Sequence, residues 1–347
     1  MRRCMVAFLF ATVGVALVSA IEIVDVRRLG EPELPLEYLN SSDLRRQLGF
    51  AEIAWIGRDT LLYNRSPLYW QADIRNGRFS RLYAVEDNVT TRFSGAYGVE
   101  QADAALIDFG NIFEGTLYGF YSIETGWIDI DRNMFDRLWL QPTFINDELR
   151  AQLAYDWEYR LLGGHAIVPR PVYGASDIGF SLRYAETGEL ELLPPGFYEF
   201  RDIGSAALAA VSFDRFRIAL VAGIVRRKKT DPYDLGWNLW VMRAVYDGTV
   251  RVADDLRSEP SWESPAVARL DAGTAVRVDD ADQYTVTASG EEDFWYRVEH
   301  DGGSGWIFGG SLMIEGEDWR ERLEDRGRPL DVAALFGEVV AGSEHEP

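Results

Sequence analysis

The chain has 347 residues, 56 acidic against 35 basic, and a formal net charge of −21. A surface of this sign repels phosphate backbones and anionic lipid headgroups, which argues against nucleic acid or a membrane surface as a broad partner. With three histidines and a single cysteine in the whole chain, two-histidine zinc centres, Ser-His-Asp triads and cysteine nucleophiles are also poorly supported.

Residues 1–20 have the pattern of a cleaved secretory signal. Arg2 and Arg3 precede an apolar stretch, Met5–Val18, and Val18-Ser19-Ala20 is a small-residue cleavage site. The stretch is shorter than the roughly 20 residues of a spanning helix. Cys4 lies inside the segment, so a lipid anchor is not expected and the mature chain has no thiol. The pattern predicts a periplasmic or secreted protein with no integral membrane segment after cleavage.

After a leader, residues 21–50, with a short helix expected near Asp43–Leu48, the chain alternates with the period of two that is typical of β-strands. Turn pairs such as Asn76-Gly77 and Thr125-Gly126 separate the runs. The strands expected up to residue 130 are Leu68–Ile74, Arg81–Val85, Ala104–Phe109, Thr116–Ile123 and Trp127–Ile130.

One helix is predicted to interrupt these strands, because Leu149, Leu153, Trp157 and Leu161 recur every four residues within 146–161. Strands then resume up to residue 246, including an apolar hairpin formed by Ile203–Phe213 and Phe216–Val225. Residues 21–246 are therefore predicted to be a large β-rich region, sandwich-like with one inserted helix. The pattern leaves open whether this region is one domain or two.

An outer-membrane barrel over residues 60–246 is an alternative for the same alternating strands. The inserted helix and the scarcity of strands of about 10 residues argue against it.

Catalytic chemistry in this region would have to rely on carboxylates, since two acids at suitable spacing can hydrolyse a glycosidic bond. Asp108, Glu124, Asp156 and Glu158 are candidates, but pairs are expected by chance among 56 acids. The alternating oxygens of Asp129–Asn133 resemble the start of a calcium loop. Met134 stands where that loop needs glycine, so a turn is the better interpretation.

Short motifs in a fixed order characterise the C-terminal part of the chain. They are Leu256–Ser261, the Gly273-centred hairpin of Ala268–Val278, Trp295–Val298, Asp301–Gly303, Gly305–Phe308 and Ser311-Leu312. This succession resembles the bacterial SH3 (SH3b) domain. The resemblance implies a small β-barrel over residues 247–314, followed by a helical, acidic tail over 315–347.

The resemblance also implies a ligand-binding face to which Arg257, Trp295, Tyr296 and Trp306 would contribute. For Trp306 the pattern favours a core role over a ligand platform. Glu259 stands where the family has glycine, so Glu259→Gly is expected to be tolerated or mildly stabilising if the turn needs positive φ.

The barrel is expected to fold on its own, because ten apolar side chains can supply one core. These are Val250, Val252, Leu256, Leu270, Val276, Val278, Trp295, Val298, Trp306 and Ile307. The family pattern does not account for Asp279–Ser289, which lengthens the region before the Trp295–Val298 strand.

The sequence favours a non-catalytic protein of the bacterial cell envelope whose SH3b module binds peptidoglycan or a partner protein, with no cofactor and no metal. A second hypothesis makes the aromatic-rich N-terminal region a carbohydrate-binding or glycan-hydrolysing domain that the module targets to the wall.

Overall fold

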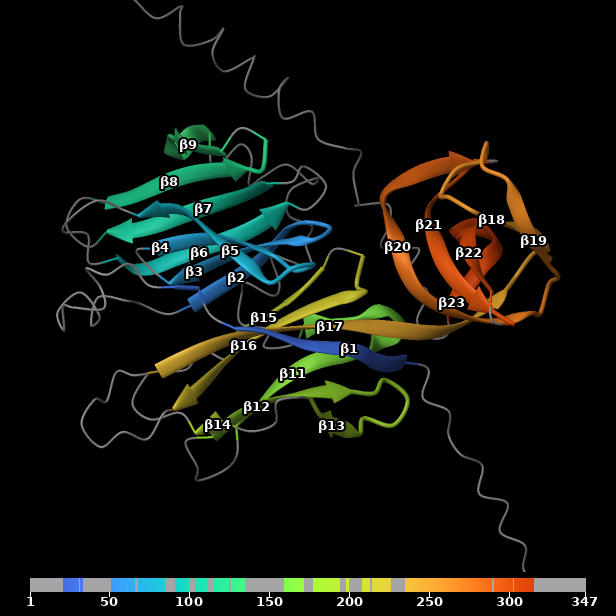
Figure 1. Cartoon of the computed structure of the whole chain (residues 1–347), viewed down its shortest axis with the longest axis horizontal. Helices are drawn as coiled ribbons and strands as arrows, with labels where there is room; N and C mark the ends of the chain where they lie inside the picture. Colours follow the sequence, from blue (N-terminus) through green and yellow to red (C-terminus); the bar gives the residue numbers. More distant parts are fainter. Residues whose placement is uncertain are drawn as a thin grey trace, which may run out of the picture.

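The computed structural model describes residues 21–30, 32–33, 51–65, 68–84, 91–99, 104–111, 115–124, 126–134, 159–171, 177–193, 198–199, 208–212, 214–225, 235–288, 290–301 and 303–314. Almost all of them lie in β-strands, which confirms the predicted mainly β class (Figure 1). None of the helical turns in these ranges has the length and apolar character needed to cross a membrane.

Two consecutive antiparallel meanders form the first two sheets, and each contains four strands in chain order. The first contains β2 (Ala51–Gly57), β3 (Thr60–Arg65), β4 (Leu68–Asp73) and β5 (Arg78–Ala84). The second contains β6 (Thr91–Val99), β7 (Ala104–Asn111), β8 (Gly115–Ser122) and β9 (Gly126–Ile130). The predicted turn at Asn76-Gly77 joins β4 to β5, and Gly77 adopts the positive φ of 69° that favours glycine. The five strands predicted up to residue 130 match β4, β5, β7, β8 and β9 within three residues at either end.

The third sheet begins where the inserted helix was predicted to end. Most of residues 146–161 lie outside the described residues, as do the helices predicted near residue 45 and in the tail. Tyr159–Arg160 form β10, so the helix is wrong at its end. Leu161, the last residue of the predicted helix, follows β10 directly and is buried in the core together with Leu162.

The turn η2 (Leu162–Gly164) then leads into the rest of the third sheet. Its other strands are β11 (Ala166–Pro171), β12 (Asp177–Arg183), β13 (Leu190–Leu192) and β14 (Tyr198–Glu199). β11 and β12 are central, and β13 and β14 pair with different parts of β12.

The fourth sheet combines the start and the end of the N-terminal region. β15 (Leu208–Val211) pairs with β16 (Arg217–Val225), as the predicted apolar hairpin requires, and β16 pairs with β17 (Leu235–Val250). The other edge of β17 pairs with β1 (Ile21–Gly30), which sequence analysis assigned to a leader. The N-terminal strand therefore completes the last sheet.

Side-chain alternation places the fourth sheet between two others. On one face Ala219, Val221, Leu239 and Val241 pack against the first sheet, and on the other Ile218, Leu220 and Met242 pack against the third. The first sheet also packs against the second, through Ile56, Leu62 and Tyr69 against Ala105 and Tyr121. The sandwich-like packing thus extends over four layers.

A small β-barrel follows, as predicted. Its strands and turn are the end of β17, β18 (Asp254–Arg257), β19 (Ala266–Leu270), β20 (Ala275–Ala288), β21 (Glu291–His300), β22 (Gly303–Phe308), η3 (Gly309–Ser311) and β23 (Leu312–Ile314). Gly273 has a φ of 86° in the turn before β20, as its role in a tight hairpin requires. Eight of the ten predicted core side chains are buried. Val252 is not, with 55% of its surface exposed, because it lies in the turn after β17 and outside the strand alternation. Trp306 is half-buried.

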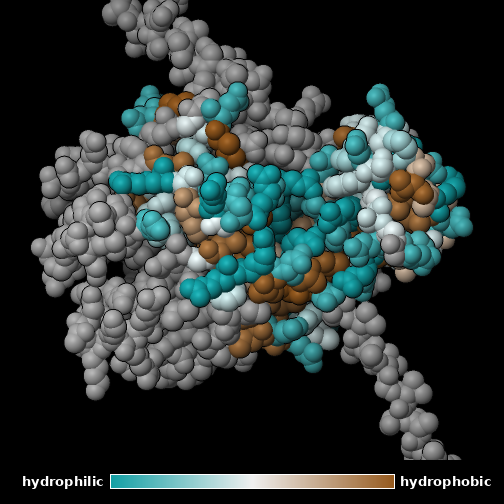
Figure 2. Space-filling model, viewed as in Figure 1, coloured by the Kyte–Doolittle hydropathy of each residue, from teal (hydrophilic) through white to brown (hydrophobic). Residues whose placement is uncertain are grey.

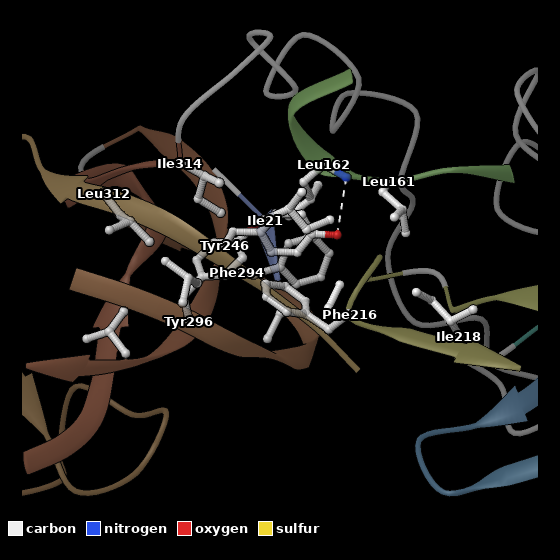
Figure 3. Packing of buried hydrophobic residues seen from close by; sticks show 14 of the residues in the cluster. Ile21, Leu161, Leu162, Phe216, Ile218, Tyr246, Phe294, Tyr296, Leu312 and Ile314 are labelled. Carbon is white, nitrogen blue, oxygen red and sulfur yellow. Dashed lines mark hydrogen bonds between the residues drawn. The ribbon is translucent and has the colours of Figure 1, made fainter. Parts of the chain in front are cut away.

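The barrel and the fourth sheet share a strand and a core. β17 runs from one into the other (Figure 1), and Tyr246 pairs with Ile21 on one side and Val278 on the other. Tyr246, Phe216 and Tyr296 belong to a single cluster of buried side chains that joins the two regions (Figure 3). The boundary drawn between residues 246 and 247 thus falls inside a continuous strand.

Candidate ligand-binding face of the barrel

The outer face of β18, β21 and β22 brings aromatic and arginine side chains together. Directly paired residues of neighbouring strands project to the same face. Trp306 of β22 pairs with Arg257 on one side and with Arg297 on the other. Two residues further along, Phe308 pairs with Trp295. We call this surface the aromatic–arginine face.

Alternation places the intervening side chains inside the barrel. Phe294, Tyr296 and Ile307 belong to the shared core, and only 2% of the surface of Tyr296 is exposed. Tyr296, which the sequence proposed as a ligand contact, therefore serves packing.

Trp262 covers one half of the aromatic–arginine face. Its ring centroid lies 4.6 Å from that of Trp295 and 5.3 Å from that of Phe308. Beneath it Trp295 is only 1% exposed, while Trp262 itself is 43% exposed. Trp295, the second proposed contact, thus supports an exposed ring that sequence analysis did not select. One feature of the sequence could have indicated this ring: Trp262 lies in the β18–β19 loop, between serines and prolines, where side chains are usually exposed.

Arg257 organises the loop that carries Trp262. Its guanidinium donates hydrogen bonds of 2.8 Å to the backbone carbonyls of Trp262 and Ser264, and lies 5.7 Å from the Trp262 ring centroid. The Ser264 hydroxyl contacts the carbonyl oxygens of Glu259 and Ser261, each at 2.9 Å. These bonds fix the position of Trp262 before any ligand arrives.

Glu259, in the same loop, does not have a positive φ. The mild stabilisation expected of Glu259→Gly required a positive φ at this position. Because φ is not positive, the substitution should relieve no backbone strain.

Trp306 lies in the other half of the face, next to the N-terminal sheets. The guanidinium of Arg58, from the β2–β3 turn, lies 5.8 Å from the Trp306 ring centroid. The same guanidinium is hydrogen-bonded to Asp280 of β20 and lies 3.9 Å from Asp282. An N-terminal side chain thus bridges to the barrel here.

The sequence comparison identifies the barrel. Residues 252–313 match the family profile of the bacterial SH3 domain. The C-terminal barrel is a bacterial SH3 domain. None of the curated proteins matches the chain.

Comparison with solved structures gives weak overlaps only. The N-terminal domain of Nup159 is 11% identical with a TM-score of 0.17, and the comparison covers 78% of this chain and 62% of that one. The β-propeller domain of the Trilobed protease from Pyrococcus furiosus gives 10% identity and a TM-score of 0.17, over 77% of this chain and 84% of that one. A triple-mutant AofleA from Arthrobotrys oligospora gives 12% identity and a TM-score of 0.18, over 77% and 73%.

Ion pairs around Asp279 join the SH3 domain to the fourth sheet. Arg297 binds the Asp279 carboxylate through two nitrogens at 2.8 and 2.7 Å, and Arg243 of β17 donates to the Asp279 carbonyl at 3.2 Å. Arg243 also binds Asp25 of β1 at 2.6 Å. Figure 2 shows hydrophilic side chains next to a hydrophobic strip where the two regions meet. The start of the extension that the family pattern did not explain, Asp279–Ser289, therefore contacts the N-terminal region.

Burial and neighbouring charges shift two carboxyl groups at this junction in opposite directions. Burial raises the pKa of Asp280, and nearby Asp214 raises it further, while Arg58, Arg217 and Arg297 act against this. Burial also disfavours ionised Asp214, but Arg217 and hydrogen bonds from Ser212 and Phe216 outweigh it and hold the pKa of Asp214 below its ordinary value.

The described histidines, His165 and His300, lie in different parts of the fold and are not part of the aromatic–arginine face. His165 is buried in the third sheet, where its Nδ1 accepts a hydrogen bond of 3.1 Å from the Ala185 amide. His300, at the end of β21, lies 3.0 Å from Asp301. In the part of the chain that the structure describes, no three His, Cys, Asp or Glu side chains are grouped to hold a metal. Asp131 accepts a hydrogen bond from the Met134 amide at 2.7 Å and so caps the helical residues 132–134, where the sequence predicted a turn.

Proposed function

We propose that this is an extracytoplasmic, non-catalytic envelope protein whose SH3 domain binds peptidoglycan through the Trp262 half of the aromatic–arginine face. The observation that carries the proposal is the exposed, pre-positioned ring of Trp262 on a buried aromatic base. A flat apolar surface of this kind suits the C–H faces of a sugar ring or the aliphatic parts of a stem peptide.

The rigidity of the loop favours binding. Two side chains, those of Arg257 and Ser264, hold the loop through hydrogen bonds to its backbone, and Trp262 rests on two further rings. Because the ring is already ordered, binding loses less conformational entropy than it would with a mobile tryptophan. Tryptophan and arginine, the two residue types that meet in this loop, are also enriched among binding hot spots.

The position of β1 is consistent with the predicted signal cleavage. Ile21, the first residue after the predicted cleavage site, is also the first residue of β1 and is buried in the shared core. Edman sequencing of the protein recovered from a periplasmic or secreted fraction should give Ile-Glu-Ile-Val. A mature chain that begins at Met1 would contradict cleavage.

Co-sedimentation with purified sacculi tests the binding proposal. Native protein should pellet with sacculi, and Trp262→Ala should weaken binding at least about tenfold, as loss of a central aromatic contact does. Val267→Ala is the matched control, because Val267 is also exposed but lies on β19, outside the face.

If native protein stays in the supernatant, peptidoglycan is not the ligand. If Trp262→Ala and Val267→Ala bind equally well, the face is wrong even when the protein pellets.

A further inference from the structure

The second half of the face has the composition of a site for a cation. The ring of Trp306 and the carboxylates of Asp280 and Asp282 all belong to the SH3 domain, and together they surround the Arg58 guanidinium. We call these three side chains the Trp306 site. An aromatic ring face and carboxylates are the groups that attract a guanidinium, through the ring quadrupole and through charge-assisted hydrogen bonds.

Arg58 reaches this site from a separately anchored backbone. It lies in the turn between β2 and β3, and its carbonyl accepts a hydrogen bond from Arg217 of β16. The backbone is thus held by the fourth sheet, while the side chain alone extends to the SH3 domain. Displacing that side chain breaks the contacts to the Trp306 site without undoing the turn.

We infer that the Trp306 site recognises an arginine side chain of a basic protein partner, and that Arg58 occupies the site as an internal ligand in the free protein. The formal net charge of −21 supports such a partner, because a protein of this sign attracts basic proteins at long range. Arginine fits better than lysine, since its planar group can lie over the ring and bind carboxylates at the same time.

Internal occupancy makes binding competitive. An incoming arginine binds only to molecules in which Arg58 has left the site. Its apparent affinity is therefore the intrinsic affinity multiplied by the fraction of molecules whose site is open. The SH3 domain remains attached throughout, because β17 continues into it. The expected change is local and is confined to the contact between the β2–β3 turn and the barrel.

This inference does not depend on peptidoglycan binding. The sacculus experiment reports on Trp262, whereas the experiment below reports on Trp306 and uses no wall material. Each can fail without the other.

The test is a titration of the full-length mature protein, followed by NMR of the ¹⁵N-labelled tryptophan indoles. The probe is acetyl-Gly-Arg-Gly-amide, and acetyl-Gly-Gln-Gly-amide is its uncharged counterpart. Trp306→Phe assigns the Trp306 signal by its disappearance. In Arg58→Ala the arginine peptide should shift this signal at about tenfold lower concentration than in the native protein. The glutamine peptide should leave it in place.

Arg75→Ala is the matched control, because Arg75 also lies in a turn of the first sheet and, among the described residues, forms its ion pairs with Asp59 and Asp73 of that sheet. It should titrate like the native protein. Arg58→Lys should give an intermediate midpoint, and it replaces Arg58→Ala as the test if the alanine variant does not fold.

Three results would overturn the inference. The first is an unmoved Trp306 signal in the Arg58 variant, and the second is an equal response to both peptides. The third is the same midpoint in the native protein and in the Arg58 variant, which would show that Arg58 does not compete for the site.

Discussion

Replacing Tyr246 should destabilise the N-terminal sheets and the SH3 domain together. The ring is fully buried, edge-on to Phe216 with the centroids 5.1 Å apart. Its hydroxyl donates to the Arg215 carbonyl at 2.6 Å and accepts a hydrogen bond of 3.4 Å from the Leu162 amide (Figure 3). Burial raises the pKa of this phenol, so it stays neutral. Tyr246 therefore contributes packing and two hydrogen bonds where the regions meet.

The two contributions can be separated. Tyr246→Ala removes the ring and should lower the free energy of unfolding by about 3–5 kcal/mol. Tyr246→Phe keeps the ring but leaves the buried Arg215 carbonyl without this donor, which should cost about 1–3 kcal/mol. Met313→Ala, at an exposed position of β23, should change stability by less than about 0.5 kcal/mol.

Urea unfolding gives the free energies, and hydrogen–deuterium exchange by mass spectrometry shows where the structure loosens. Tyr246→Ala should increase exchange in β11–β12 and in β21–β22 to a similar degree, because both pack into one cluster. Faster exchange on one side alone, or two separate urea transitions of which one is unchanged, would refute the shared core.

Four further outcomes are expected. Trp306→Ala should cost about 1–2 kcal/mol, less than a buried tryptophan, because the ring is only half-buried; urea unfolding measures this. Asp214 stabilises the fold above its ordinary pKa and loses that contribution as pH falls through its lowered pKa, so Asp214→Asn should flatten the acid limb of a stability profile and lower stability at pH 7. Asp280→Asn should not lower stability at pH 7, because burial raises that pKa and ionisation opposes folding; a clear loss would contradict this. Burial lowers the pKa of His165, so stability should fall as pH drops below about 6.5, and His165→Gln should remove that dependence in thermal melts.

Sequence patterns predicted the local elements well where one principle decided them. Alternating apolar residues located β7, β8 and β9, and paired turn residues such as Asn76-Gly77 located the hairpins. The SH3 motifs located the barrel because its tight turns and large rings constrain spacing. These signals are local, so they are visible without knowledge of the fold.

Long-range pairing was not predictable in the same way. Nothing in Ile21–Gly30 shows that its partner is β17, more than 200 residues away, since strand pairing depends on the other three strands of that sheet. The helix expected over 146–161 was wrong at its end, because Leu161 is buried by packing in the shared core after a strand and not on a helical face. Trp262 was missed because its role depends on Trp295 and Phe308, which only the folded loop brings beneath it.

Acidic side chains help to join the two regions. Like charges repel one another, so three aspartates within four residues of β20, of which Asp279 is buried, should oppose compact packing. Here Arg297 and Arg243 neutralise Asp279, and Arg58 contacts both Asp280 and Asp282. Arg297 belongs to the barrel, whereas Arg243 and Arg58 come from the N-terminal region, so the charges are fully compensated only when the SH3 domain is docked. The extension of β20 therefore makes the orientation of the barrel depend on the N-terminal sheets.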